Sequence, residues 1–223
     1  MPTKHRSALL DLIATHSFKL GDFTLASGQK SDYYIDCRTT TLHAQGGRLA
    51  GLVLYQLIRE HMPLAVAVGG LTMGADPLVS NVASASAWAL ADYIETLALS
   101  KVLELDEEDH GPAPTLIHGF LVRKAEKTHG TGRRIEGFLQ PGAQVVIVDD
   151  VCTTGGSTVT AIEAAREAGM VVAGVLCLVD REQGGRLVIE RALAEVPSDE
   201  DLPFLSVFTA KDVRKAHVAL HSK

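Results

Sequence analysis

The chain has 223 residues, of which 46% are hydrophobic, so it can bury one substantial core without help from disulfide bonds. Its formal net charge of -6 argues against a protein whose main partner is a nucleic acid or an acidic membrane, because such partners need a basic surface. The three cysteines are widely spaced, which fits a reduced protein better than a disulfide framework. No apolar run approaches the ~20 residues that a membrane helix needs. We therefore expect one domain over residues 1–223, soluble and cytoplasmic, that binds neither nucleic acid nor membrane.

The first forty residues are expected to form a small cap outside the main sheet, which we call the hood. Helical periodicity covers residues 7–14. Strand-like pieces come after it at 22–25 and 32–37, with Gly21 and Gly28 in the turns. Residues 1–40 are therefore expected to lie apart from the main sheet that the later strands form.

The rest of the chain alternates strands with helices. A helix is predicted at 43–60, and a loop at 70–77 leads from the first strand into another helix. Further helices lie between or after most of the predicted strands, which span residues 64–69, 115–122, 145–149, 171–179 and 204–208. Such alternation predicts an α/β fold with a doubly wound, mainly parallel sheet.

Residues 84–114 are predicted to be an exposed insertion. A long helical pattern rich in alanine and leucine runs into the acidic stretch from Glu104 to Asp109 and then into a turn with glycine and proline. A short charge run is usually solvated surface, so we assign it no binding role.

The segment 145–158 carries the strongest functional signal. Its four apolar residues suit a strand covered on both faces, and Asp149 and Asp150 follow at the sheet edge where ligands of open α/β folds bind. The loop from Thr153 to Thr158 can direct backbone N–H groups and hydroxyls at an anion on the next helix N-terminus. The two acids could bind the hydroxyls of a ribose, and the loop could bind its 5-phosphate. The segment therefore predicts a site for a phosphorylated sugar.

A plainer alternative for this segment is a tight turn at Gly155 and Gly156, with Ser157 or Thr158 as an ordinary helix N-cap. The chain has neither the G-x-x-x-x-G-K-[ST] phosphate loop nor the G-x-G-x-x-G dinucleotide motif. The combination of strand, paired acids and hydroxyl-rich turn resembles the diphosphoribose-binding motif of the type I phosphoribosyltransferases.

Residues 123–134 form a second candidate, which we call the basic loop. It holds five cations and a histidine in a chain that is acidic as a whole, and Gly130 and Gly132 give it conformational freedom. A cationic loop can close over a polyphosphate and neutralise the charge that develops on a leaving group. The alternatives are a solvated hairpin tip or a contact to nucleic acid.

Three segments resemble the orotate phosphoribosyltransferases. The basic loop matches the family's catalytic pattern R-K-x-x-K-x-H-G, residues 23–36 resemble its orotate-contacting segment, and Leu178-Val-Asp-Arg181 resembles the strand end whose arginine binds the orotate carboxylate. The resemblance covers about residues 18–185, with the motifs in the family's order.

This resemblance implies the members of the site. The implied catalytic residues are Asp149, Asp150, Arg123, Lys124, Lys127 and His129. The same six are implied to contact 5-phosphoribosyl 1-diphosphate (PRPP), together with Thr72, Met73, Val151, Cys152, Thr153, Thr154, Gly155, Gly156 and Ser157. The implied orotate contacts are Tyr34, Ile35, Thr153 and Arg181.

The resemblance also implies a reaction and partners. The reaction is transfer of the 5-phosphoribosyl group from PRPP to N1 of orotate, giving orotidine 5-phosphate and diphosphate. Mg²⁺ is the implied cofactor, held mainly by substrate oxygens and water, with no dedicated ligands from the chain. The implied assembly is a homodimer whose basic loop reaches into the neighbouring subunit's site.

Two positions depart from the family pattern, and two other functions stay open. Ala26 and Met73 stand where bacterial members often have lysines, so two cations for the diphosphate are missing. One alternative is a phosphoribosyltransferase for a purine base, against which Arg181 and residues 23–36 argue. The other is a regulator on the same fold that senses the ligand or binds RNA without turnover, against which the basic loop and the net charge argue.

Overall fold

The main body of the protein is one mixed sheet covered by helices. The computed structural model describes residues 3–24, 30–102, 112–124, 134–195 and 202–222. Within them the six-stranded sheet has the order β5-β4-β3-β6-β7-β8, in which only β5 runs antiparallel to its neighbour. In that order the strands are Ile135–Gly137, His118–Val122, Ala67–Leu71, Gln144–Cys152, Val171–Asp180 and Phe204–Thr209. The predicted α/β fold with a mainly parallel sheet is confirmed.

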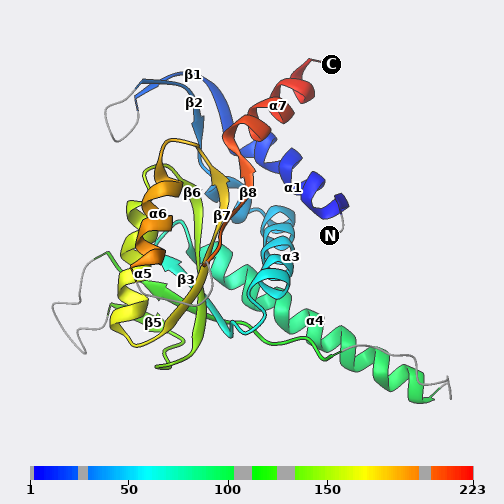
Figure 1. Ribbon diagram of the computed structural model, residues 1–223. Helices are drawn as coiled ribbons and strands as arrows, with labels where there is room; N and C mark the ends of the chain where they lie inside the picture. The colour runs from blue at the N-terminus through cyan, green and yellow to red at the C-terminus, as the bar shows by residue number, and fades with distance from the viewer. Residues whose placement is uncertain (1–2, 25–29, 103–111, 125–133, 196–201, 223) are drawn as a thin grey trace.

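Helices lie on both faces of this sheet (Figure 1). α3 (Ala44–His61) and α4 (Asp76–Val102) cover one face, and α5 (Gly156–Glu167) and α6 (Gly185–Ala194) cover the other. Successive residues of β6 point to opposite faces, so Val146 and Val148 belong to the core under α3 and α4, whereas Val145 and Ile147 belong to the core under α5 and α6. Double coverage explains why this strand is a continuous apolar run.

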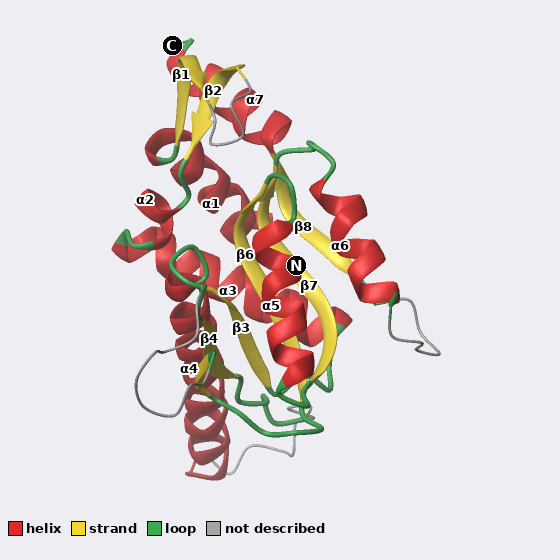
Figure 2. Cartoon of the chain, turned by 90° about the vertical axis from the view of Figure 1, so that its left-hand side faces the viewer, coloured by secondary structure: helices red, strands yellow, loops and turns green. Residues whose placement is uncertain are grey.

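The hood is a two-stranded antiparallel sheet beside a pair of helices (Figures 1 and 2). β1 (Phe18–Thr24) pairs with β2 (Lys30–Ile35), and α1 (Thr3–His16) packs against α7 (Ala210–His221), so the first and last helices lie side by side here. α7 begins with a capping box, in which Thr209 Oγ1 accepts from the Asp212 N–H at 3.2 Å and Asp212 Oδ2 accepts from the Thr209 N–H at 2.9 Å. The C-terminal helix therefore completes the hood that residues 1–40 begin.

Several element boundaries differ from those expected. The strand predicted at 64–69 begins at Ala67 and continues through Gly70 to Leu71, and Leu64 is exposed. Gly70 pairs with Leu121 of β4, and glycine is required there because an added Cβ would lie 2.3 Å from the Val148 carbonyl oxygen of β6. Strand β4 begins at His118, three residues later than predicted.

The predicted insertion shares its first residues with a core helix. α4 continues without a break through residue 84, and Ser86 is buried, where its Oγ accepts from the Ile117 N–H at 3.0 Å. Beyond Ser86 only Ala89 among the described residues of α4 still packs against the core, and the helix continues to Val102 as an arm with exposed side chains at Ile94, Leu99 and Val102 (Figure 1). The acidic stretch 104–109 lies outside the described residues. The assignment of residues 1–223 to one domain, with an insertion at 84–114, stays a prediction. No helix in the described ranges, α4 included, has the length and hydropathy to cross a membrane.

Candidate active site

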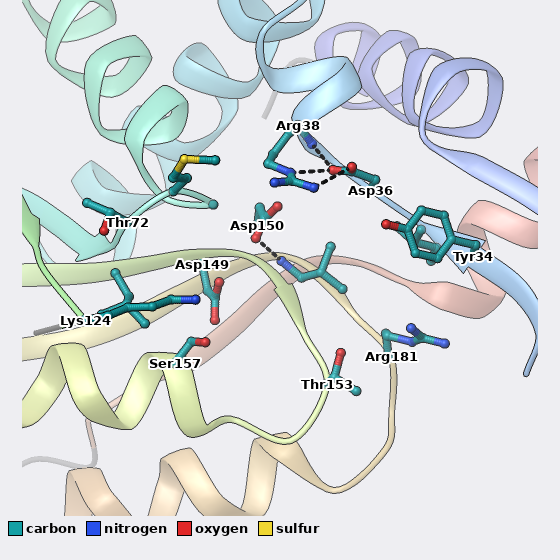
Figure 3. Close-up of a pocket in the computed structure, with 15 residues that line it drawn as sticks. Tyr34, Asp36, Arg38, Thr72, Lys124, Asp149, Asp150, Thr153, Ser157 and Arg181 are labelled. Atoms are coloured by element: carbon teal, nitrogen blue, oxygen red, sulfur yellow. Dashed lines mark hydrogen bonds and ion pairs between the residues drawn. The ribbon is translucent and has the colours of Figure 1, made fainter. Parts of the chain in front are cut away.

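A cavity of about 570 Å³ opens at the carboxyl end of the parallel strands, beneath the hood (Figure 3). This is the edge where ligands bind in open α/β sheets. Its walls come from β2, from the segment after it, from the end of β3 and the following loop, and from the ends of β4, β6 and β7. The lining residues are Tyr34, Ile35, Asp36, Arg38, Leu71, Thr72, Met73, Gly74, Lys124, Asp149, Asp150, Val151, Thr153, Ser157 and Arg181.

The two acids lie inside β6, which continues to Cys152, three residues beyond the predicted strand end at 149. Asp149 Oδ2 accepts a hydrogen bond from Thr158 Oγ1 at 2.6 Å, and Asp150 Oδ1 accepts one from the Val151 N–H at 3.0 Å. Burial raises the pKa of both carboxyls, that of Asp149 to about 7, while these two hydrogen bonds act in the opposite direction. The pair is therefore held in a low-dielectric wall, where a hydrogen bond to either carboxylate is strong.

The loop after β3 passes directly against the second acid. An added Cβ on Gly74 would lie 2.4 Å from Asp150 Oδ1, so only glycine leaves room for the carboxylate there. Thr72 and Met73 line the cavity beside it, and the Met73 side chain is largely exposed. This loop therefore forms one wall of the space in front of Asp150.

The loop after β6 leads into the N-terminus of α5. Gly155 caps the helix with a φ of 82°, and an added Cβ there would lie 2.8 Å from the Gly185 carbonyl oxygen. Thr153 and Ser157 face the cavity (Figure 3), so the first turn of α5 presents its N-terminal end to the same space. Free N–H groups and the helix dipole make such an end a site for a phosphate.

Arg181 follows β7 and joins the sheet to the hood. Its guanidinium carbon lies 4.7 Å from the centre of the Tyr33 ring, and its Nη2 donates to Ser31 Oγ at 3.3 Å. The residue is only 7% exposed, its Nε has no hydrogen-bond partner, and none of the described carboxylates pairs with it. A buried guanidinium without an anion is costly, so this end of the cavity suits an anionic ligand.

The cavity gathers residues that the sequence analysis took from five separate segments. The predicted site residues that line it are Tyr34, Ile35, Thr72, Met73, Lys124, Asp149, Asp150, Val151, Thr153, Ser157 and Arg181. Lys127 and His129 lie outside the described residues, as does Ala26.

Five other predicted residues do not line the cavity. Arg123 Nε pairs with Glu136 Oε1 at 3.2 Å, on the β4–β5 pair. Cys152 is buried at the end of β6, Thr154 and Gly155 lie in the turn before α5, and Gly156 is the first residue of the helix. Gly155 and Gly156 have no side chain, so any contact from them to a ligand would come through their backbone.

Four lining residues were missed by the sequence analysis: Asp36, Arg38, Leu71 and Gly74. Asp36 was quoted only as part of a resembling segment, and Arg38 was not considered. The available signal was the Asp-x-Arg spacing directly after a predicted strand, which allows a close ion pair across one turn.

Sequence comparison places these features in a family. The phosphoribosyl transferase domain matches residues 122–196, which include the acid pair, the α5 loop and Arg181. The orotate phosphoribosyltransferase of Synechocystis sp. is 39% identical over 213 residues, covering 95% of this chain and 90% of the relative. That of Aquifex aeolicus is 38% identical over 211 residues, covering 93% and 97%. The chain belongs to the orotate phosphoribosyltransferase family.

Solved structures of orotate phosphoribosyltransferases share the fold. The Mycobacterium tuberculosis enzyme in complex with Fe(III) dicitrate aligns with a TM-score of 0.68 at 32% identity, covering 94% of this chain and 98% of that one. The same enzyme in complex with PRPP aligns with a TM-score of 0.63 at 28% identity, covering 96% and 93%. The family resemblance inferred from the sequence motifs is confirmed.

Proposed function

We propose that the chain transfers the 5-phosphoribosyl group of PRPP to N1 of orotate, a step of de novo pyrimidine synthesis. The bond from ribose C1 to the diphosphate oxygen breaks, a bond from C1 to N1 forms, and N1 loses its proton. The products are orotidine 5-phosphate and diphosphate. The observation that carries this proposal is Arg181, a buried guanidinium without an anionic partner in a cavity that also holds the paired acids.

Arg181 would bind the carboxylate of orotate in a bidentate manner. Its stacking on Tyr33 orients the guanidinium plane, and Tyr34, Ile35 and Thr153 line the adjacent space for the pyrimidine ring. Uracil, which lacks the carboxylate, would leave this buried cation unpaired. A site built for one polar group rejects the analogue without it strongly, which supports orotate as the substrate.

The acid pair and the α5 loop would hold the phosphoribosyl group. Asp149 and Asp150 would accept hydrogen bonds from ribose hydroxyls and offset the positive charge that the ribose acquires as diphosphate leaves. Thr153, Ser157 and the N-terminus of α5 would bind the 5-phosphate. This role requires ionised carboxylates.

Mg²⁺ is part of the proposal, held largely by the substrate. The described residues contain no group of three or more side chains that could form a metal cage. This donor set fits Mg²⁺, which keeps several waters and binds through one or two carboxylates and substrate phosphates. Asp149 and Asp150 would reach it through water or ribose oxygens, and the ion would neutralise charge on the diphosphate.

The proposal includes a homodimer with shared sites. Lys124, at the start of the basic loop, lines the cavity of its own subunit, whereas Arg123 turns to Glu136 outside that cavity. Arg123 together with Lys127 and His129 would contact the diphosphate in the neighbouring subunit. The family resemblance of the basic loop supports this arrangement.

Comparison of bases tests the function. Purified protein would receive PRPP, Mg²⁺ and, in separate reactions, orotate, uracil, hypoxanthine or adenine, with diphosphate release as the readout. We expect release with orotate alone. Release with hypoxanthine or adenine but not orotate would replace the proposal with a purine enzyme, and PRPP binding without release on any base would favour a regulator.

A further inference from the structure

Arg38 stands at the border between the active-site cavity and a second cavity. It is the first residue of α2 (Arg38–Thr41), a single helical turn between the hood and α3. The second cavity has a volume of about 500 Å³, and Arg38 and Met73 line both cavities. Arg38 therefore lies beside the loop that forms the wall in front of Asp150.

Asp36 holds the Arg38 side chain in one orientation (Figure 3). Arg38 Nε donates to Asp36 Oδ1 and Arg38 Nη2 donates to Asp36 Oδ2, both at 2.8 Å. The Arg38 N–H also donates to Asp36 Oδ1, at 3.1 Å. This bidentate pair fixes the plane of the guanidinium, because both groups are planar and the two bonds are parallel.

One edge of the guanidinium remains available. No hydrogen bond joins Nη1 to any described residue, and the Arg38 side chain is 43% exposed. Figure 3 shows Arg38 on the opposite side of Asp150 from the α5 loop, with Lys124 and Arg181 on two other sides. The two N–H donors of Nη1 are therefore free for a ligand in the cavity.

The charges along the cavity indicate which ligand group this is. Its three cations are Arg38, Lys124 and Arg181, and its acids are Asp36 and the β6 pair. Arg181 belongs to the proposed orotate end. Residues 71–74 bring no charge to their wall. Lys124 borders its Thr72 end, because the Thr72 N–H donates to the Val122 carbonyl at 2.9 Å, and Arg38 borders its Met73 end. An anionic group lying along residues 71–74 would meet Arg38.

A purely local role does not account for the whole arrangement. The Asp36 carboxylate would help to begin α2 by accepting the Arg38 N–H, but this needs no arginine side chain. The second and third hydrogen bonds instead orient the guanidinium at the cavity. Burial raises the pKa of Asp150, and the nearby Asp36 adds to this rise while Arg38 opposes it, so the carboxylate pair alone gives no electrostatic reason for the arginine.

We propose that Arg38 binds the diphosphate group of PRPP and that Asp36 is the positioning residue that holds it there. The inference rests on the proposed function, because it takes PRPP as the ligand of this cavity. Arg38 supplies a fixed cation at a wall where Met73 has none. Arg38 and the basic loop, which includes Lys124, would together neutralise the charge on the leaving group.

The test compares Arg38→Ala, Arg38→Lys and Asp36→Asn with a matched control, Arg214→Ala. Arg214 is an arginine of nearly equal side-chain exposure, 45%, paired with Asp32 at 2.7 Å, and it lies outside both cavities. For each protein we would measure kcat, the KM of PRPP and of orotate, and the affinity for inorganic diphosphate with Mg²⁺. Melting curves would show that each variant is folded.

Arg38→Ala is expected to raise the KM of PRPP roughly tenfold to a hundredfold, the loss typical of one charged hydrogen-bonding group, and to weaken diphosphate binding to match. The KM of orotate should stay within about threefold. Arg38→Lys and Asp36→Asn should give smaller rises in the KM of PRPP, because each keeps the charge but loses the fixed fork. Arg214→Ala should match the wild type.

An unchanged KM for PRPP in Arg38→Ala, or equal rises for both substrates, would overturn the inference. If Arg38→Ala does not fold, the two conservative variants decide: wild-type values for PRPP in both would overturn it. A wild-type protein without orotate turnover would refute the proposed function instead. In that case equal diphosphate affinity in the wild type and Arg38→Lys would still refute the role of Arg38.

Discussion

Thr158 Oγ1 lies 2.6 Å from Asp149 Oδ2 and donates a hydrogen bond to it from the first turn of α5. Burial raises the pKa of Asp149 to about 7, and this hydrogen bond is the largest influence that lowers it. The threonine is itself buried, so water cannot replace its hydroxyl. The proton affinity of the site's central acid is therefore set partly by one side chain of the next helix.

Thr158→Val should shift the pH profile of the reaction. Without the hydroxyl the pKa of Asp149 rises further above its usual value, and the carboxylate needed for the ribose becomes protonated at higher pH. We expect the acid limb of kcat/KM to move upward, so that the loss of activity relative to the wild type is largest below about pH 7 and shrinks above it. Thr160→Val is the matched control, because Thr160 Oγ1 bonds only to the Gly156 carbonyl on the exposed side of α5. A profile identical to the wild type would contradict this role of Thr158.

The same acid should make the ligand-free protein less stable as the pH rises. A folded-state pKa of about 7, against 3.8 for the ordinary group, means that the folded chain binds this proton more tightly than the unfolded chain. The resulting stability is fully present below about pH 4 and is lost as the pH rises through about 7. Asp149→Asn removes the ionisation, so its free energy of unfolding should fall less between pH 5 and pH 7.5 than that of the wild type. Urea unfolding at the two pH values measures this, and equal falls would count against it.

Arg181→Lys should impair orotate binding selectively. Lysine keeps the charge but loses the bidentate fork and the stacking on Tyr33, so we expect the KM of orotate to rise roughly a hundredfold. The KM of PRPP should change little. Arg186→Lys is the control, since Arg186 also stacks on an aromatic ring, that of Phe204 at 4.5 Å, but lies outside the cavity. Equal effects on both substrates would argue against Arg181 as the carboxylate site.

Complementation should reveal shared sites in the proposed dimer. Lys127→Ala and Asp150→Ala should each be nearly inactive alone, because one lacks a cation for the diphosphate and the other a ribose acid. Mixed heterodimers would contain one site with neither defect, so part of the activity should return. The mixture is assayed after subunit exchange, with differently tagged chains to show that heterodimers form. Proven heterodimers without activity would refute the shared site.

The main sheet and the acid pair could be predicted because their signal is local and repeated. The run before Asp149 is apolar at every position, and such a run is typical of a strand buried on both faces. Arg181 could be placed at the site because it follows a similar run, and parallel strands end at one edge. The family resemblance then implied which ligand group each would bind: ribose hydroxyls for the acid pair and the orotate carboxylate for Arg181.

Other features depend on contacts that no local pattern encodes. Gly70 was assigned to a loop, but it pairs with β4, and the glycine is there because the Val148 backbone leaves no room for a side chain. Strand β5 and helix α2 are three and four residues long, too short for a periodic signal. Arg38 was missed because it is the first residue of α2, and a helix of one turn has no periodic pattern that would place its side chain. The path of α4 beyond Ser86 could not be foreseen, because an alanine-rich helical pattern looks alike in a core and in an exposed arm.

The most direct measurement of the central claim is the conversion of orotate itself, followed by its ultraviolet absorbance with PRPP and Mg²⁺ present. We predict loss of orotate with formation of orotidine 5-phosphate, and return of orotate when orotidine 5-phosphate is incubated with diphosphate. Folded protein that binds PRPP but converts orotate in neither direction would contradict the assignment of this cavity as an orotate phosphoribosyltransferase site.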